Sequence, residues 1–447
     1  MPNRMKRIVL TLAAIVIVAG GGGLRLQAAG ERPQIPPVLT LPQALEIAFA
    51  QSTALRRAAS QVWQAEGQAR QARAALLPQL SVTAVESLQT ENLKARGIDI
   101  PFAPSRVGPF QAVDARARLA QSVLDVAARR RNQAGEARLD ASLDRQANSR
   151  EQVAWGVVVA YAQALRSQQT VATLRQQASL AVQLSDIADE RFTQGVASAV
   201  DVKRSSQQVN NIEQALSEAE NALTAAKLQL ANLLHAQITA DYELAPLRAG
   251  SDALPAPEAA LAAAKDARPD YRAAAAQLRA AELSLRAARS QRYPTLQFLS
   301  HYGQSGRKPF ENLNTFQVQG ALTVPVFTGG RIAAEAREAE GRREEAHALL
   351  EEAESQVETD VLTALAAVAA ARREIELAEA TTRLAREELD LASARFTSGV
   401  ADNTEVVNAQ DRLARSEENH IRALFRWNLA QADFYRSIGA AEKTFRQ

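Results

Sequence analysis

The stretch Arg191–Val202, RFTQGVASAVDV, returns later in the chain as RFTSGVADNTEV at residues 395–406. Seven of the twelve positions are identical, and the offset between the copies is 395 − 191 = 204 residues. Each copy lies in a long tract of strong helix formers and centres on a glycine, Gly195 or Gly399. Because a glycine in left-handed conformation commonly ends a helix, each copy predicts a sharp corner between two helices.

The residues after each glycine predict that a new helix begins at once. Ser198 stands three residues before Asp201, and Asp402 stands three residues before Glu405, which is the spacing of a capping box. After a first step of seven from Val202 to Val209, apolar residues recur in alternating steps of three and four, as in the seam of a coiled coil. The same register is less apolar after the second corner.

The helices that lead into the corners are predicted to be very long. No proline occurs between Pro109 and Pro246 or after Pro325, and a proline would interrupt a helix. The tracts Val126–Thr193 and Gly330–Thr397 each contain 68 residues, or about 100 Å of helix at ~1.5 Å per residue.

A second pair of landmarks shows that the repetition extends over most of the chain. LLPQLSV around Pro78 matches RYPTLQF around Pro294, at an offset of 294 − 78 = 216 residues. We therefore expect two structural repeats, each with a helix, a β-hairpin and a long helical hairpin. Their bounds are 39–245, with a β-hairpin at about 81–123, and 254–440, with one at about 295–327; residues 246–257 form a linker.

Strand-like sequence occurs only between each proline landmark and each long helix. In Phe316–Val326 one face is apolar (Phe316, Val318, Leu322, Val324, Val326) and the other polar (Gln317, Gln319, Thr323). In the first repeat, Val113, Ala115, Ala117 and Leu119 alternate with Asp114, Arg116 and Arg118. This alternation suits a membrane barrel with charges toward a wet lumen, but four strands are too few to close one.

Composition excludes several classes of function. With a net charge of +2, the chain offers no electrostatic case for nucleic acid. It contains no cysteine, and its four histidines lack the spacing of metal ligands, so we expect no metal site, no cofactor and no enzyme activity. Residues 1–29 have the plan of a cleaved signal peptide, the alternative being an uncleaved membrane anchor.

On these residues the chain resembles the TolC-like outer-membrane efflux protein family. The resemblance covers about residues 39–440 and rests on LTLPQALEIAFAQS from Leu39, on the prolines before each strand pair and on the two corners. It implies a mainly α fold with a small β part: a homotrimer with a 12-stranded barrel in the outer membrane and a coiled-coil tunnel in the periplasm. It also implies a passive exit duct for efflux or type I secretion, joined by a periplasmic adaptor to an inner-membrane pump.

The resemblance assigns roles to particular residues. The turns Gly195-Val196-Ala197 and Gly399-Val400-Ala401 would dock the adaptor, and Asp201, Glu405 and Asn408 would line the gate. Asp114, Arg116 and Arg118 would face the barrel lumen.

The chain departs from the family pattern at three positions. Asn408 stands where the family has a carboxylate, and Ala401 where some members have a gating arginine. No N-terminal cysteine is present for a lipid anchor, so the strands alone would hold the protein in the outer membrane.

Two alternatives remain open at this point. Asp201 and Glu405 could serve only to place negative charge at helix N-termini, where the helix dipole favours it. The whole chain could instead be a soluble periplasmic or surface coiled-coil scaffold without channel activity.

Overall fold

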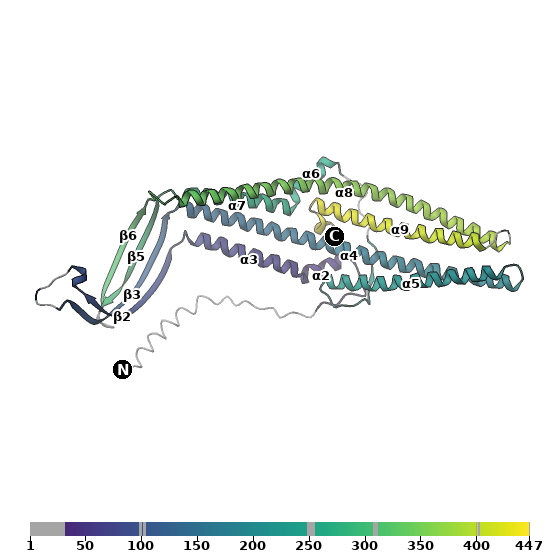
Figure 1. Cartoon of the computed structure of the whole chain (residues 1–447), viewed down its shortest axis with the longest axis horizontal. Coiled ribbons are helices and arrows are strands. Elements are labelled where there is room, and N and C mark those ends of the chain that lie inside the picture. The colour runs from purple at the N-terminus through teal and green to yellow at the C-terminus, as the bar shows by residue number, and fades with distance from the viewer. Residues whose placement is uncertain are drawn as a thin grey trace, which may run out of the picture.

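The structure is a computed structural model that describes residues 32–97, 101, 104–247, 255–306, 312–398, 400 and 403–446. The expected signal peptide, and Gly399, Ala401 and Asp402 of the second corner, lie outside these residues. The molecule is elongated: four strands lie at one end, and long helices run from them to a tip at the other (Figure 1).

Each half of the chain opens with two short helices and continues with two strands and two long helices. In chain order the elements are β1 (Val38–Leu39), α2 (Leu41–Gln51), α3 (Thr53–Ala74), β2 (Gln79–Asn92), the 3₁₀ turn η2 (Lys94–Arg96), β3 (Arg106–Leu124), α4 (Val126–Thr193), α5 (Ala199–Leu233), β4 (Glu243–Leu244), α6 (Pro257–Ala267), α7 (Pro269–Ser290), β5 (Thr295–Gly306), β6 (Asn312–Thr323), α8 (Arg331–Thr397), α9 (Asn403–Ser437) and α10 (Ala441–Phe445).

The two halves correspond element by element. Helices α2 and α3 recur as α6 and α7 with both ends shifted by 216 residues, and α5 recurs as α9 with both ends shifted by 204. The long helices α4 and α8 contain 68 and 67 residues. α8 is one residue shorter than the sequence predicts because Gly330, with a φ of 81°, is its N-cap rather than its first helical residue.

The four long strands form one sheet in the order β2-β3-β5-β6, in which all neighbours are antiparallel. Directly paired residues lie on one face, so the register places Arg116 beside Thr83 and Gly303, and Arg118 beside Ser81 and His301. The opposite face is apolar and largely exposed, with Leu80, Val82, Tyr302, Phe316, Val318 and Leu322.

The last predicted strand ends earlier than expected. β6 stops at Thr323, so Val324 and Val326 lie beyond it. Pro325 has no N–H group to donate to a neighbouring strand, which makes it a poor residue inside a sheet.

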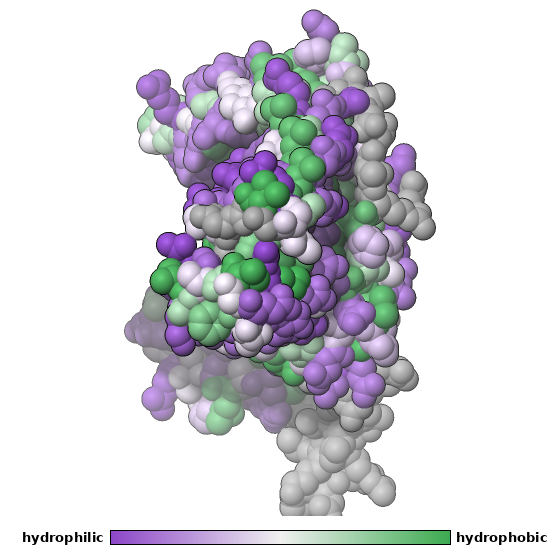
Figure 2. Space-filling view, turned by 90° about the vertical axis from the view of Figure 1, so that its right-hand side faces the viewer, coloured by the Kyte–Doolittle hydropathy of each residue, from purple (hydrophilic) through white to green (hydrophobic). Residues whose placement is uncertain are grey.

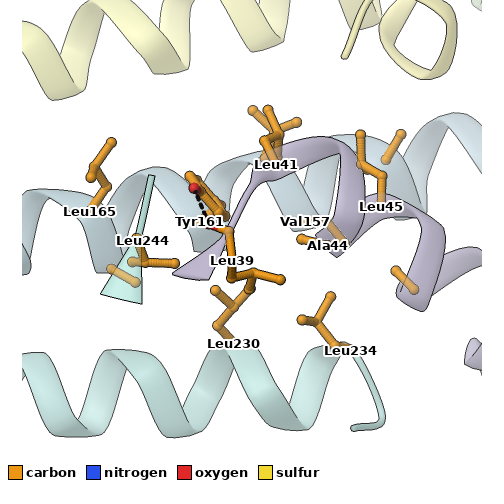
Figure 3. Close-up of a cluster of buried hydrophobic side chains, with 14 of the residues drawn as sticks. Leu39, Leu41, Ala44, Leu45, Val157, Tyr161, Leu165, Leu230, Leu234 and Leu244 are labelled. Atoms are coloured by element: carbon orange, nitrogen blue, oxygen red, sulfur yellow. Dashed lines mark hydrogen bonds between the residues drawn. The ribbon is translucent and has the colours of Figure 1, made fainter. Parts of the chain in front are cut away.

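The largest buried cluster lies in the middle of the molecule, where β1 pairs in parallel with β4 beside α4. Tyr161 of α4 is fully buried there, and its hydroxyl lies 2.8 Å from the carbonyl oxygen of Leu39 (Figure 3). The same hydroxyl lies 2.7 Å from the carbonyl oxygen of Ala245. A hydroxyl has one proton, so it donates to one carbonyl at a time. Burial raises the pKa of Tyr161 to about 12, and the proton stays in place at any physiological pH.

Candidate functional site at the helical corners

The first corner is built from backbone hydrogen bonds that satisfy the end of α4. The N–H of Val196 donates to the carbonyl of Arg191 at 2.9 Å, and that of Gly195 donates to Phe192 at 2.9 Å. This pair of bonds is the Schellman arrangement, which needs a left-handed residue. Gly195 supplies it with a φ of 80°, and no heavy atom would lie within 4 Å of an added Cβ. Glycine is therefore required for its backbone conformation, not for space.

The predicted capping box at the start of α5 is confirmed. The Ser198 hydroxyl accepts from the N–H of Asp201 at 3.3 Å, while the Asp201 carboxylate accepts from the N–H of Ser198 at 3.0 Å. The same carboxylate lies 3.9 Å from Arg204. Asp201 thus has a local structural role, whatever else it does at the tip.

The second corner shares the backbone of the first in its described part but differs in its side chains. The N–H of Val400 donates to the carbonyl of Arg395 at 3.0 Å, as Val196 does to Arg191. The Glu405 carboxylate lies 3.2 Å from the Arg395 guanidinium, in an ion pair within one hairpin. Asn408 is exposed one turn further along α9.

The two hairpins are joined at the tip by a contact that the sequence analysis missed. The Arg191 guanidinium of α4 lies 4.5 Å from the centre of the Phe396 ring of α8, and it donates a hydrogen bond to the Phe396 carbonyl. Phe396 is buried in a cluster with Leu389 and Val406. The sequence did carry a signal for this contact, because both copies of the repeated stretch begin with Arg-Phe.

The outermost part of the tip exposes apolar side chains. Val196 and Val400 are 63% and 70% exposed, and Val200 is also exposed. Figure 2 looks onto this end of the molecule and shows hydrophobic groups among hydrophilic ones. These exposed valines leave apolar surface at the tip that another molecule could contact.

The charged strand residues lie at the opposite end of the molecule from the corners (Figure 1). Asp114 and Arg116 form an ion pair at 2.6 Å, and Arg116 lies 3.4 Å from the ring nitrogen Nε2 of His301. Arg118 donates to the Thr83 hydroxyl at 3.4 Å. The candidate residues therefore form two groups, one at the helical tip and one on the polar face of the sheet.

Two features are absent from the part of the chain that the structure describes. It contains no group of three or more His, Asp or Glu residues placed to hold a metal ion. None of its helices combines the length and the apolar character needed to cross a lipid bilayer.

Comparisons with known proteins agree with this architecture. The family model described as "Outer membrane efflux protein" matches residues 44–235 and again 260–440. The chain therefore belongs to the outer membrane efflux protein family. This family consists of outer-membrane channel proteins and not of enzymes, and membership supports an outer-membrane location.

Individual relatives support the same fold. The outer membrane protein OprJ of Pseudomonas aeruginosa is 34% identical over 118 residues, so the match spans 26% of this chain and 25% of OprJ. The outer membrane protein VceC of Vibrio cholerae superposes with a TM-score of 0.78 at 20% identity, covering 90% of this chain and 96% of VceC. The CmeC channel of Campylobacter jejuni gives 0.78 at 16% identity, covering 90% and 86%. The resemblance to TolC-like channels is thus confirmed at the level of the fold.

Proposed function

We propose that the chain is the passive outer-membrane exit duct of a tripartite efflux or type I secretion system. In this proposal three copies assemble, each from two structural repeats (39–245 and 254–440) joined by residues 246–257. The sheets insert into the outer membrane, and the helical tips meet a periplasmic adaptor and, through it, an inner-membrane pump.

The observation that carries this proposal is the four-stranded sheet. Its edge strands β2 and β6 have no further strand beside them among the described residues, and one of its faces is apolar and exposed. Open edges and apolar faces are both unfavourable in water. Three sheets joined edge to edge would give twelve strands, which is enough to close a barrel with the apolar face toward lipid. Asp114, Arg116 and Arg118 would then face the lumen.

The tip supports the second half of the proposal. The adaptor would contact two turns at the tip, Gly195-Val196-Ala197 and Gly399-Val400-Ala401. Asp201 and Glu405 lie in the first turns of α5 and α9, and Asn408 lies in the second turn of α9. In a trimer they would be repeated around one axis, where carboxylates attract cations by focusing the field.

The proposal is tested by purification followed by conductance measurements. We expect the full chain to fractionate with outer membranes, to need detergent for extraction, to elute as a trimer and to form ion-conducting pores in planar bilayers. A water-soluble monomer released from the periplasm without detergent would refute the duct and support the scaffold.

A further inference from the structure

Each corner carries an Arg-Phe pair, Arg191-Phe192 in the first and Arg395-Phe396 in the second. The arginine of one corner could contact the phenylalanine of the other in two ways, and only one of these contacts forms within the described chain. Arg191 lies over Phe396, as described above. The reciprocal partners would be Arg395 and Phe192. In the described structure Phe192 is 47% exposed and Arg395 binds Glu405 of its own hairpin instead. One of the two equivalent contacts is thus present, and the residues of the other, Phe192 and Arg395, lie at the surface.

The same imbalance continues along the long helices. Five residues of α4 at alternating steps of three and four are buried or half-buried toward the second hairpin: Gln177, Leu180, Leu184, Ile187 and Arg191. The five positions of α8 that lie 204 residues later are all exposed: Thr381, Leu384, Glu388, Leu391 and Arg395.

The exposed leucines of α8 form a regular stripe. Leu384 and Leu391 are 62% and 67% exposed, and Leu377, one heptad earlier, is 70% exposed. Leucines at heptad spacing are the pattern by which one helix packs along another. α8 therefore carries a helix-packing seam that no helix of the described chain covers.

The surface that would receive this seam lies at the other edge of the molecule. Near the tip the helices lie in the order α8, α9, α4, α5, so α8 and α5 are the outer ones (Figure 1). Helix α9 is packed between α8 and α4, and its residues Val406 and Leu413 are buried. Their counterparts on α5, Val202 and Val209, are only half-buried.

We propose that a second copy of this chain covers the α8 edge. In this seam α8 of one copy packs against the α4–α5 hairpin of the next, and Arg395 lies over the ring of Phe192 of the partner subunit. A second copy is the fitting occupant for two reasons. The exposed stripe of α8 repeats the face of α4 that packs on the second hairpin, and the half-buried face of α5 repeats the buried face of α9. The seam rests on the proposed trimer and specifies the helix faces and the side-chain pair that would join its copies.

Cross-linking of full-length protein in outer membranes tests the seam, because the chain has no cysteine of its own. The double variant Phe192→Cys/Arg395→Cys is treated with a short bis-maleimide, since arginine and phenylalanine are too long for a disulfide to replace their contact. We expect covalent dimers and trimers on denaturing gels. The matched pair Arg191→Cys/Phe396→Cys reproduces the contact within the chain and should give only monomers with an internal cross-link.

Three outcomes would overturn the seam. If the Phe192/Arg395 pair gives no covalent oligomers while the same sample elutes as a trimer, the seam is wrong and the trimeric duct stands. If either single variant cross-links as strongly as the pair, the contact is not the proposed one. If the unmodified chain is a monomer in detergent, the trimer and the seam are both wrong.

Discussion

The middle of the molecule and its helical tip share the same long helices but are stabilised in different ways. In the middle, large side chains such as Tyr161 and Leu230 are completely buried, and Arg268 is buried against two carboxylates. At the tip, Val196 and Val400 face solvent, and backbone hydrogen bonds hold the turn. The middle is therefore a stable core of the single chain, whereas the tip presents a surface that a partner can complete.

The largest effect is expected at Arg268, in the middle. Its guanidinium lies 2.6 Å from Asp270 and 2.9 Å from Asp360, and the side chain is 8% exposed. Arg268→Ala removes charge-assisted hydrogen bonds to two carboxylates, each worth about 1.5–3 kcal/mol, and the carboxylates are themselves about a third exposed, so the free energy of unfolding should fall by about 3–4 kcal/mol. Chemical denaturation in detergent measures this. Arg372→Ala, at a half-exposed arginine of α8, is the control, and an equal loss there would contradict the contrast.

Deletion of apolar side chains should separate the two regions directly. Leu230→Ala removes a fully buried side chain and should cost ~3 kcal/mol of unfolding free energy, through lost burial and the cavity left behind. Val196→Ala at the exposed tip should change stability by less than ~0.5 kcal/mol. Thermal unfolding followed by circular dichroism compares them. Equal shifts would mean that the tip is as tightly packed as the middle.

A change of backbone conformation should have an intermediate effect at the tip. Gly195→Val places a β-branched residue in the left-handed region and should cost about 1–2 kcal/mol locally. We expect trimers to persist while efflux is lost, because the variant distorts the turn that is proposed to meet the adaptor. Gly195→Asn is the control, since asparagine adopts this conformation more readily, and it should retain efflux. Full efflux in both variants would exclude the first corner from adaptor docking.

The pH dependence of stability should have a small contribution from Asp270. Burial alone would raise the pKa of this carboxyl, but the hydrogen bonds and charge of Arg268 outweigh it, so the pKa lies below its ordinary value of 3.8. The unfolded chain then binds the proton more readily, and stability falls on acidification below about pH 4. Because Asp270 is partly exposed, the effect is at most about 1 kcal/mol. Unfolding from pH 6 to pH 3 should be less pH-dependent in Asp270→Asn than in the parent.

The smallest effect on stability, but a measurable one on function, is expected at Glu405. Glu405→Gln removes a half-exposed charge from the tip and should leave the unfolding free energy nearly unchanged. If carboxylates line the gate, the variant pore should lose part of its cation preference, which reversal potentials in a salt gradient measure. Glu418→Gln, further along α9, should not change selectivity. An unchanged reversal potential in Glu405→Gln would remove this residue from the constriction.

The sequence predicted most of what depends on local rules. Helix α4 has the predicted bounds, Gly195 ends the first corner, and Ser198 and Asp201 form the capping box, because caps and glycine conformations act over a few residues. The end of β6 was predicted too late because apolar alternation continues past Pro325.

Contacts across the chain could not be predicted in the same way. The contact of Arg191 with Phe396 joins residues 205 apart, and the Tyr161 hydroxyl reaches carbonyls that carry no side-chain signal. A heptad pattern identifies the face of a helix that packs but not the neighbour that it meets.

The equal lengths of the helices that follow the corners have an evolutionary consequence. α5 and α9 each contain 35 residues, and the helices before the corners differ by one, so both corners end at the same level. An insertion in one hairpin alone would carry its corner past the other and separate the Arg191–Phe396 contact. An insertion of seven residues would preserve the heptad repeat of the helices. Paired insertions or deletions of whole heptads would therefore change the reach of the tip without disturbing either feature, whereas insertions of three or four residues would locally overwind or unwind the coiled coil.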